Sequence, residues 1–127
     1  MAWKESLSST EIESDTLEKL LKDRENGKVD FLLIDIRELY EYSDLSIEGT
    51  DLLLPTTTIH TKMELLESLK DRFLILYCRT GSRTSHMLRV LSRMNFKRVT
   101  HLSNGIVSYG GRTLKNAPIP NKIDGDM

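Results

Sequence analysis

The single cysteine of the chain, Cys78, stands where a reactive thiol is expected. An apolar run at 73–77 precedes it, and the polar segment Arg-Thr-Gly-Ser-Arg at 79–83 follows it. We expect a strand to end at Cys78 and a helix to begin after the polar segment, so that the helix points unpaired N–H groups and its positive end toward the sulfur. Thiols beside helix N-termini and cations have pKa values well below the usual value of about 8.5. The sequence therefore predicts a thiolate nucleophile at Cys78.

The alternative is that Cys78 only fills the core, because a free cysteine is usually a small buried hydrophobe. Its C-terminal neighbours are polar, however, and two arginines, Arg79 and Arg83, follow it closely. A core cysteine needs neither, so we favour the reactive interpretation. With no second cysteine in the chain, sulfur carried on Cys78 has to leave to an acceptor from outside the chain.

The elements that must position Cys78 alternate between strands and helices. Asp15 is the expected N-cap of the first helix, and Gly27 its expected end. We predict strands at 31–35, 51–54, 73–77 and 97–102, and helices at 15–26, 38–42, 63–69, 84–94 and 106–109.

This alternation predicts an α/β fold with a mainly parallel sheet, in which ligands bind at the carboxyl ends of the strands. Cys78 lies at such an end. We expect one domain over residues 1–112, followed at 113–127 by a tail that is packed on the surface or flexible, because the tail holds prolines and no periodic pattern.

Composition excludes several classes of function. A chain of 127 residues with 39% apolar residues supplies one core, and a net charge of −1 argues against binding to nucleic acid or to an anionic membrane. No apolar run approaches the roughly 18 residues of a membrane span, and the first residues lack the pattern of a signal peptide. We therefore expect a cytoplasmic protein, present as a monomer or a weak dimer. None of the three histidines indicates a metal site or a base.

Five short motifs occur in an order that resembles the single-domain rhodanese-like sulfurtransferases. The resemblance covers roughly residues 12–120. The motifs are Asp-Ile-Arg-Glu at 35–38 with Glu-Tyr at 41–42, Ile-Glu-Gly at 47–49, Tyr-Cys-Arg-Thr-Gly-Ser-Arg at 77–83, Phe-Lys-Arg-Val at 96–99, and Leu-Ser-Asn-Gly-Ile at 102–106.

The resemblance implies a three-layer fold with helices on both faces of the sheet, and no cofactor. It also implies a small anionic sulfur donor such as thiosulfate, a persulfide on Cys78, and cyanide or a thiol as the acceptor. The loop after the cysteine would bind the donor and the persulfide. Its residues are Arg79, Thr80, Gly81, Ser82 and Arg83, in which Gly81 lets the backbone turn inward and the hydroxyls of Thr80 and Ser82 donate hydrogen bonds.

Four charged residues of these motifs have further expected roles. Asp35 and Arg37 form an ion pair that supports the loop after their strand, a structural role that we favour over a catalytic one. Glu41 is at a position that in the family faces the mouth of the pocket, although a solvated helix residue is the alternative. Arg83 either attracts the donor or forms an ion pair with a nearby acid, and both roles can coexist.

Two other functions remain open. Cysteine phosphatases and related arsenate reductases place five residues between cysteine and arginine, whereas four separate Cys78 from Arg83. The shorter loop favours a cradle for one sulfur atom over a phosphate site. The second alternative is a sulfur-carrier or regulatory module with little turnover of its own, which would accept sulfur from a persulfide-bearing protein.

Overall fold

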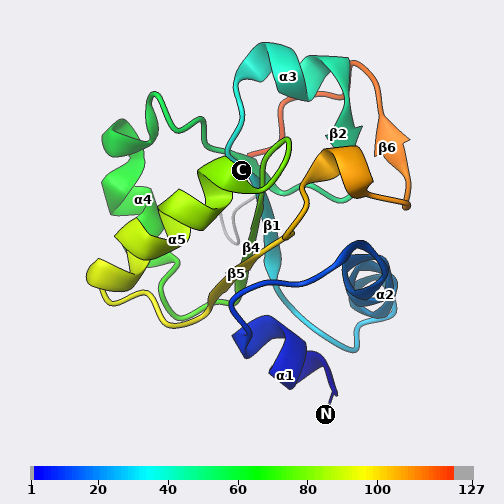
Figure 1. Cartoon of the computed structure of the whole chain (residues 1–127), viewed down its shortest axis with the longest axis horizontal. Helices are drawn as coiled ribbons and strands as arrows, with labels where there is room; N and C mark the ends of the chain where they lie inside the picture. Colours follow the sequence, from blue (N-terminus) through cyan, green and yellow to red (C-terminus); the bar gives the residue numbers. More distant parts are fainter. Residues whose placement is uncertain (1, 122–127) are drawn as a thin grey trace.

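The computed structural model describes residues 2–121, and its centre is a four-stranded parallel sheet in the order β3-β1-β4-β5 (Figure 1). The strands are β1 (Leu32–Asp35), β3 (Leu52–Leu53), β4 (Leu74–Tyr77) and β5 (Val99–His101). Each lies within a segment predicted as a strand. The mainly parallel sheet and the α/β class are thereby confirmed.

Helices cover both faces of this sheet (Figure 1). On one face lie α1 (Ala2–Ser8), α2 (Ser14–Glu25) and the 3-10 helix η2 (Ile106–Ser108); on the other lie the 3-10 helix η1 (Ile59–Lys62), α4 (Met63–Ser68) and α5 (Ser82–Arg93). The remaining helix, α3 (Leu39–Asp44), follows the carboxyl end of β1.

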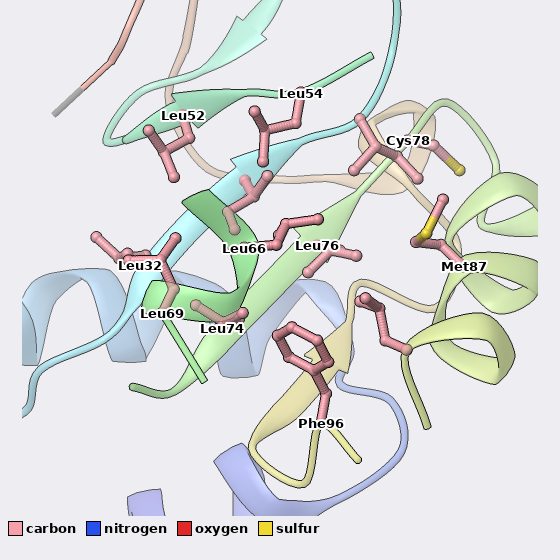
Figure 2. Packing of buried hydrophobic residues seen from close by; sticks show 13 residues of the cluster. Leu32, Leu52, Leu54, Leu66, Leu69, Leu74, Leu76, Cys78, Met87 and Phe96 are labelled. Carbon is pink, nitrogen blue, oxygen red and sulfur yellow. The ribbon is translucent and has the colours of Figure 1, made fainter. Parts of the chain in front are cut away.

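The two central strands supply both cores because their side chains alternate between the faces. All four residues of β1 and all four of β4 are buried, as expected for parallel strands covered on both sides. Leu74 and Leu76 pack under α4 and α5, whereas Ile75 and Tyr77 pack under α2. Cys78 continues this alternation and joins the cluster under α5 (Figure 2).

Several elements differ from the sequence prediction at their ends. Helix α2 begins at Ser14 with Glu13 as N-cap, so Asp15 is inside the helix and is not its cap. The helix still ends ahead of Gly27, whose φ of +75° is the left-handed conformation of a C-terminal stop. Helix α5 begins at Ser82, two residues earlier than expected, and the short helix at 106–109 is a 3-10 helix.

Four elements were not predicted: α1, η1, and the strands β2 (Ser46–Ile47) and β6 (Thr113–Leu114). The buried Leu7 and the edge-on contact between Trp3 and Phe73 attach α1 to the core. Strands β2 and β6 pair antiparallel, and β6 lies inside the stretch expected to be a tail. The domain boundary at 112 stays a prediction, and the last part of that tail, 122–127, lies outside the described residues. Over residues 2–121, no helix has the length and apolar character to cross a membrane.

Candidate active site

The sulfur of Cys78 lies beneath the loop that follows β4. The side chain is fully buried, with 0% of its surface exposed. The Gly81 N–H donates to Sγ at 3.1 Å, and the hydroxyl of Thr84 lies 3.6 Å from the same sulfur. Gly81 reaches this position because it is the N-cap of α5 and adopts φ +102°, a conformation that glycine takes without a steric penalty. The backbone is thus bent back toward its own cysteine.

These contacts change the acidity of the thiol. Burial raises the pKa of Cys78, but the N–H and hydroxyl of Thr84 and the N–H groups of Gly81 and Arg83 outweigh it, so that the pKa lies below its usual value. The start of α5 therefore stabilises a negative charge on the sulfur, as anticipated for a helix N-terminus.

We expect the thiolate of Cys78 to titrate below the roughly 8.5 of a free thiol. Its ultraviolet absorbance, measured against a Cys78→Ser control, should already be partly present at neutral pH. Because the thiolate is the reactive form, any reaction at this sulfur should slow as pH falls through the midpoint and level off above it. A midpoint at or above the free-thiol value would contradict this assignment.

Two glycines hold the cysteine loop against the loop after β5. A Cβ on Gly81 would collide with the carbonyl oxygen of Ser103, and one on Gly105 would collide with the carbonyl of Arg79. Gly105 also has a positive φ of +68°. Just beyond it, the Ile106 N–H donates to the Cys78 carbonyl at 2.9 Å. The shape of the cysteine loop therefore depends on a segment more than twenty residues further along the chain.

Asp35 and Arg37 form a buried ion pair beside the site. The Arg37 guanidinium donates to both Asp35 carboxylate oxygens, with Nη2–Oδ2 at 2.9 Å, and Nη2 also donates to the Leu45 carbonyl at 2.6 Å. Only 5% of the Arg37 side chain and 0% of the Asp35 side chain are exposed. Removing either partner would therefore leave a buried charge unpaired. The pair connects the end of β1 to the end of α3, and its role in supporting the loop stays a prediction.

A second ion pair joins α5 to α3. Arg83, in the first turn of α5, donates from Nη1 and Nη2 to the two carboxylate oxygens of Glu41 in α3, at 2.8 and 2.9 Å. This bidentate hydrogen bond, opposed by partial burial, lowers the pKa of Glu41 to about 2. Both charges therefore persist at neutral pH. The acid expected near Arg83 is thus the residue predicted at the pocket mouth.

The other loop residues point outward. Arg79, Thr80 and Ser82 are exposed, and no residue within 2–121 forms an ion pair with Arg79. The roles expected for these side chains in donor binding stay predictions. A hollow of about 390 Å³ opens beside Arg83, between the first turns of α5 and the segment before η1; it is lined by Thr56, Ser82, Arg83, His86 and Met87. Met87, which lines this hollow, belongs to the same buried cluster as Cys78 (Figure 2).

Sequence reasoning missed Thr84, which lies near the sulfur, and His101, which contacts Thr84. Thr84, rather than Thr80 or Ser82, places its hydroxyl near Sγ, and its Oγ1 lies 2.6 Å from Nδ1 of His101. Both are buried. A Thr at the third position of α5 would have been a detectable signal, because that helix was predicted, whereas no local pattern indicates His101. The described residues contain no group of three or more His, Cys, Asp or Glu side chains placed to hold a metal ion.

A buried cysteine at the carboxyl end of a central parallel strand, with a glycine-capped helix behind it, is an arrangement found in rhodanese-type α/β domains. The chain belongs to the rhodanese-like domain family, whose model matches residues 16–111. A sulfurtransferase of Allochromatium vinosum is 35% identical over 99 residues, which cover 78% of this chain and 86% of that protein.

Two further comparisons agree with this membership. A probable adenylyltransferase/sulfurtransferase MoeZ of Mycobacterium tuberculosis is 34% identical over 77 residues, 61% of this chain, and the matching region spans only 19% of that protein. The crystal structure of a rhodanese-related protein from Thermoplasma volcanium has the same fold, with a TM-score of 0.68 and 21% identity, covering 84% of this chain and 98% of that one.

Proposed function

We propose that this protein transfers sulfane sulfur through a persulfide on Cys78. The observation that carries the proposal is the surroundings of the Cys78 sulfur. The sulfur is buried under a loop of four residues, the Gly81 N–H donates to it, and the N–H groups at the start of α5 lower the pKa of the thiol. The name of the Allochromatium relative, which this chain matches over most of its length, supports the same chemistry.

The first half-reaction begins with the Cys78 thiolate. Its sulfur attacks the outer sulfur of thiosulfate, a new S–S bond forms, and the bond between the two thiosulfate sulfurs breaks with its electron pair leaving on sulfite. The negative charge of the resulting Cys78–S–S⁻ then lies among the loop N–H groups, which are already oriented before the reaction.

The second half-reaction returns the enzyme to its first state. Cyanide or a thiolate attacks the terminal sulfur of the persulfide, that sulfur leaves as thiocyanate or as a new persulfide, and the electron pair of the broken S–S bond restores the Cys78 thiolate. No cofactor takes part in this balance. We place the donor in the hollow beside Arg83, where the guanidinium attracts an anion, and we expect exposed Arg79 to assist its approach.

The experiment is intact-protein mass measured after incubation with thiosulfate and again after cyanide. We expect a gain of one sulfur atom, followed by its loss with release of thiocyanate. Protein alkylated at Cys78 is the matched control and should gain nothing. Absence of the adduct on reduced, accessible protein would reject thiosulfate as the donor.

Two further measurements distinguish sulfur transfer from the alternative functions. If Cys78 takes sulfur only from a persulfide-bearing protein or peptide and releases it slowly to small thiols, the chain is a sulfur carrier. Hydrolysis of a phosphate ester or reduction of arsenate at a rate above that of sulfur transfer would instead favour phosphatase-type or reductase chemistry. We expect neither, because the loop has four residues between Cys78 and Arg83.

Glu41→Gln is expected to improve donor binding while slightly weakening the fold. The substitution removes the negative charge that neutralises Arg83, so we expect KM for thiosulfate to fall by about three-fold with kcat little changed. Stability should fall by about 0.5–1 kcal/mol, because the pair is partly exposed.

Steady-state kinetics and denaturant unfolding measure the two effects of Glu41→Gln. The matched control is Glu67→Gln, which makes the same charge change in the pair between Glu67 of α4 and Lys70 just after this helix, and it should leave KM unchanged. A higher KM in Glu41→Gln would show instead that Glu41 positions Arg83 for the donor.

A further inference from the structure

The side chains of Cys78, Thr84 and His101 form a series of contacts that connects the sulfur to strand β5. Thr84 Oγ1 is 3.6 Å from Cys78 Sγ and 2.6 Å from His101 Nδ1. Thr84 is 0% exposed and His101 only 6% exposed, so water does not compete freely for these contacts. The Thr84–His101 contact is the shortest polar contact of this group.

This series of contacts reaches a surface hollow at His101. The edge of His101 lines a second hollow, of about 420 Å³, formed by the segment after α1 and by a different face of α5 from the one that lines the hollow beside Arg83. The charged residues at this second hollow are Glu11, Arg89 and Lys97. Nε2 of His101 is 3.9 Å from a carboxylate oxygen of Glu11, whose charge favours a proton on the ring.

The hydroxyl of Thr84 has a single proton and three possible acceptors for it: Sγ of Cys78, Nδ1 of His101, and the carbonyl oxygen of Gly81, to which Oγ1 can donate at 3.1 Å. While Cys78 is a thiol, its S–H can donate to Oγ1 and the hydroxyl can donate to Nδ1 of His101. Once Cys78 is a thiolate, its charged sulfur is the strongest of the three acceptors, and the hydroxyl donates to it when Nδ1–H donates to Oγ1. When Nδ1 carries no proton, a hydroxyl that donates to it is unavailable to the thiolate.

We propose that His101 is a positioning residue that takes up the Cys78 thiol proton through the hydroxyl of Thr84 and then holds that hydroxyl as a donor to the thiolate. The proton leaves Sγ for Oγ1 as the hydroxyl proton passes to Nδ1, and the product is a thiolate and an imidazolium joined by Thr84. Charge and protons balance within the protein, and Nε2 can release the extra proton into the second hollow. The inference rests on the proposed function only in taking Cys78 as the reacting group.

Burial lowers the pKa of His101, and Glu11 opposes this effect. The ring is therefore neutral at neutral pH and can accept a proton before the thiol ionises. This is the state that the relay requires at its start.

The test is the pH titration of the thiolate absorbance, which needs no sulfur donor and can succeed even if thiosulfate is not a substrate. We expect Thr84→Val to lower the thiolate-to-thiol ratio at fixed pH by about tenfold, because the sulfur loses a hydrogen bond to its charged form. We expect a similar loss in His101→Leu, because without Nδ1–H the hydroxyl is no longer held toward the sulfur and can donate to the Gly81 carbonyl. The double variant should be no worse than either single one, because both remove the same bond.

The conservative variants decide between positioning and mere packing. Thr84→Ser keeps the hydroxyl and should titrate like the wild type. His101→Asn can place an amide N–H near the position of Nδ1, so it should restore most of the thiolate, while losing any second step that the His101 titration adds to the wild-type curve. If His101→Leu fails to fold, His101→Asn and Thr84→Val still give this comparison.

Two results would overturn the proposal. The first is a thiolate titration that moves in Thr84→Val but not in His101→Leu, which would show that Thr84 acts alone. The second is an equal loss in His101→Leu and His101→Asn with additive effects in the double variant, which would show that His101 acts through packing. Failure of the sulfur adduct with an intact relay, or the reverse, distinguishes this inference from the proposed function.

Discussion

Cys78→Ser is expected to lower the rate of sulfur transfer by at least ~10³-fold while leaving the fold intact. Serine keeps the size of the side chain and accepts the Gly81 N–H, but an alkoxide is not formed at neutral pH and an oxygen cannot carry the persulfide. With no other cysteine in the chain, no second residue can replace it.

Initial rates of thiocyanate release measure the loss in Cys78→Ser, and denaturant unfolding supplies the control. The stability of Cys78→Ser should lie within about 1 kcal/mol of the wild type, because the substituted hydroxyl finds the donors that the sulfur had. A variant that unfolds at the same denaturant concentration and retains a tenth of the activity would show that the chemistry does not run through this sulfur.

Gly81→Ala is expected to damage both stability and activity. The new Cβ would collide with the Ser103 carbonyl, and the residue would have to keep φ at +102°, which L-residues rarely adopt. We expect a loss of about 2–4 kcal/mol in stability. Relief of the clash moves the Gly81 N–H away from the sulfur, so the thiolate pKa should rise and transfer should slow by about 10²-fold.

Gly27→Ala is the matched control for Gly81→Ala. Gly27 also has a positive φ, of +75°, but nothing lies within 4 Å of the position where its Cβ would be. Gly27→Ala should therefore lower the free energy of unfolding by only about 1 kcal/mol, the cost of the left-handed backbone conformation, and should keep full activity. Equal losses of stability in the two variants, with normal sulfur transfer in Gly81→Ala, would mean that the contact between the two loops has no role at the site.

The sequence pattern was sufficient for the sheet because strands and long helices carry their own periodicity. The run at 73–77 and the apolar stripe of α5 predict a buried strand and an amphipathic helix without any knowledge of their neighbours. Helix α1 and strand β6 carry no such signal. They are seven and two residues long, and they form only where Leu7 and Trp3 reach the core and where β2 offers a partner.

The candidate site, too, could be predicted from the sequence only in part. The position of Cys78, the glycine after it and the following helix could be predicted because they are adjacent in sequence. The acid that pairs with Arg83 could be predicted in kind but not identified as Glu41, since the two are 42 residues apart. The contact of Thr84 with His101 joins α5 to β5 and depends on how the helix packs against the sheet, which no short segment encodes.

The interlocked loops at 79–81 and 103–105 have a consequence for the order in which the protein is made. A growing chain exposes Cys78 before residues 103–106 exist, and at that stage the Ser103 carbonyl does not yet pack against Gly81 and the Ile106 N–H does not yet donate to the Cys78 carbonyl. We expect the cysteine loop to reach its final shape, and Cys78 its full thiolate character, only after those residues emerge and dock.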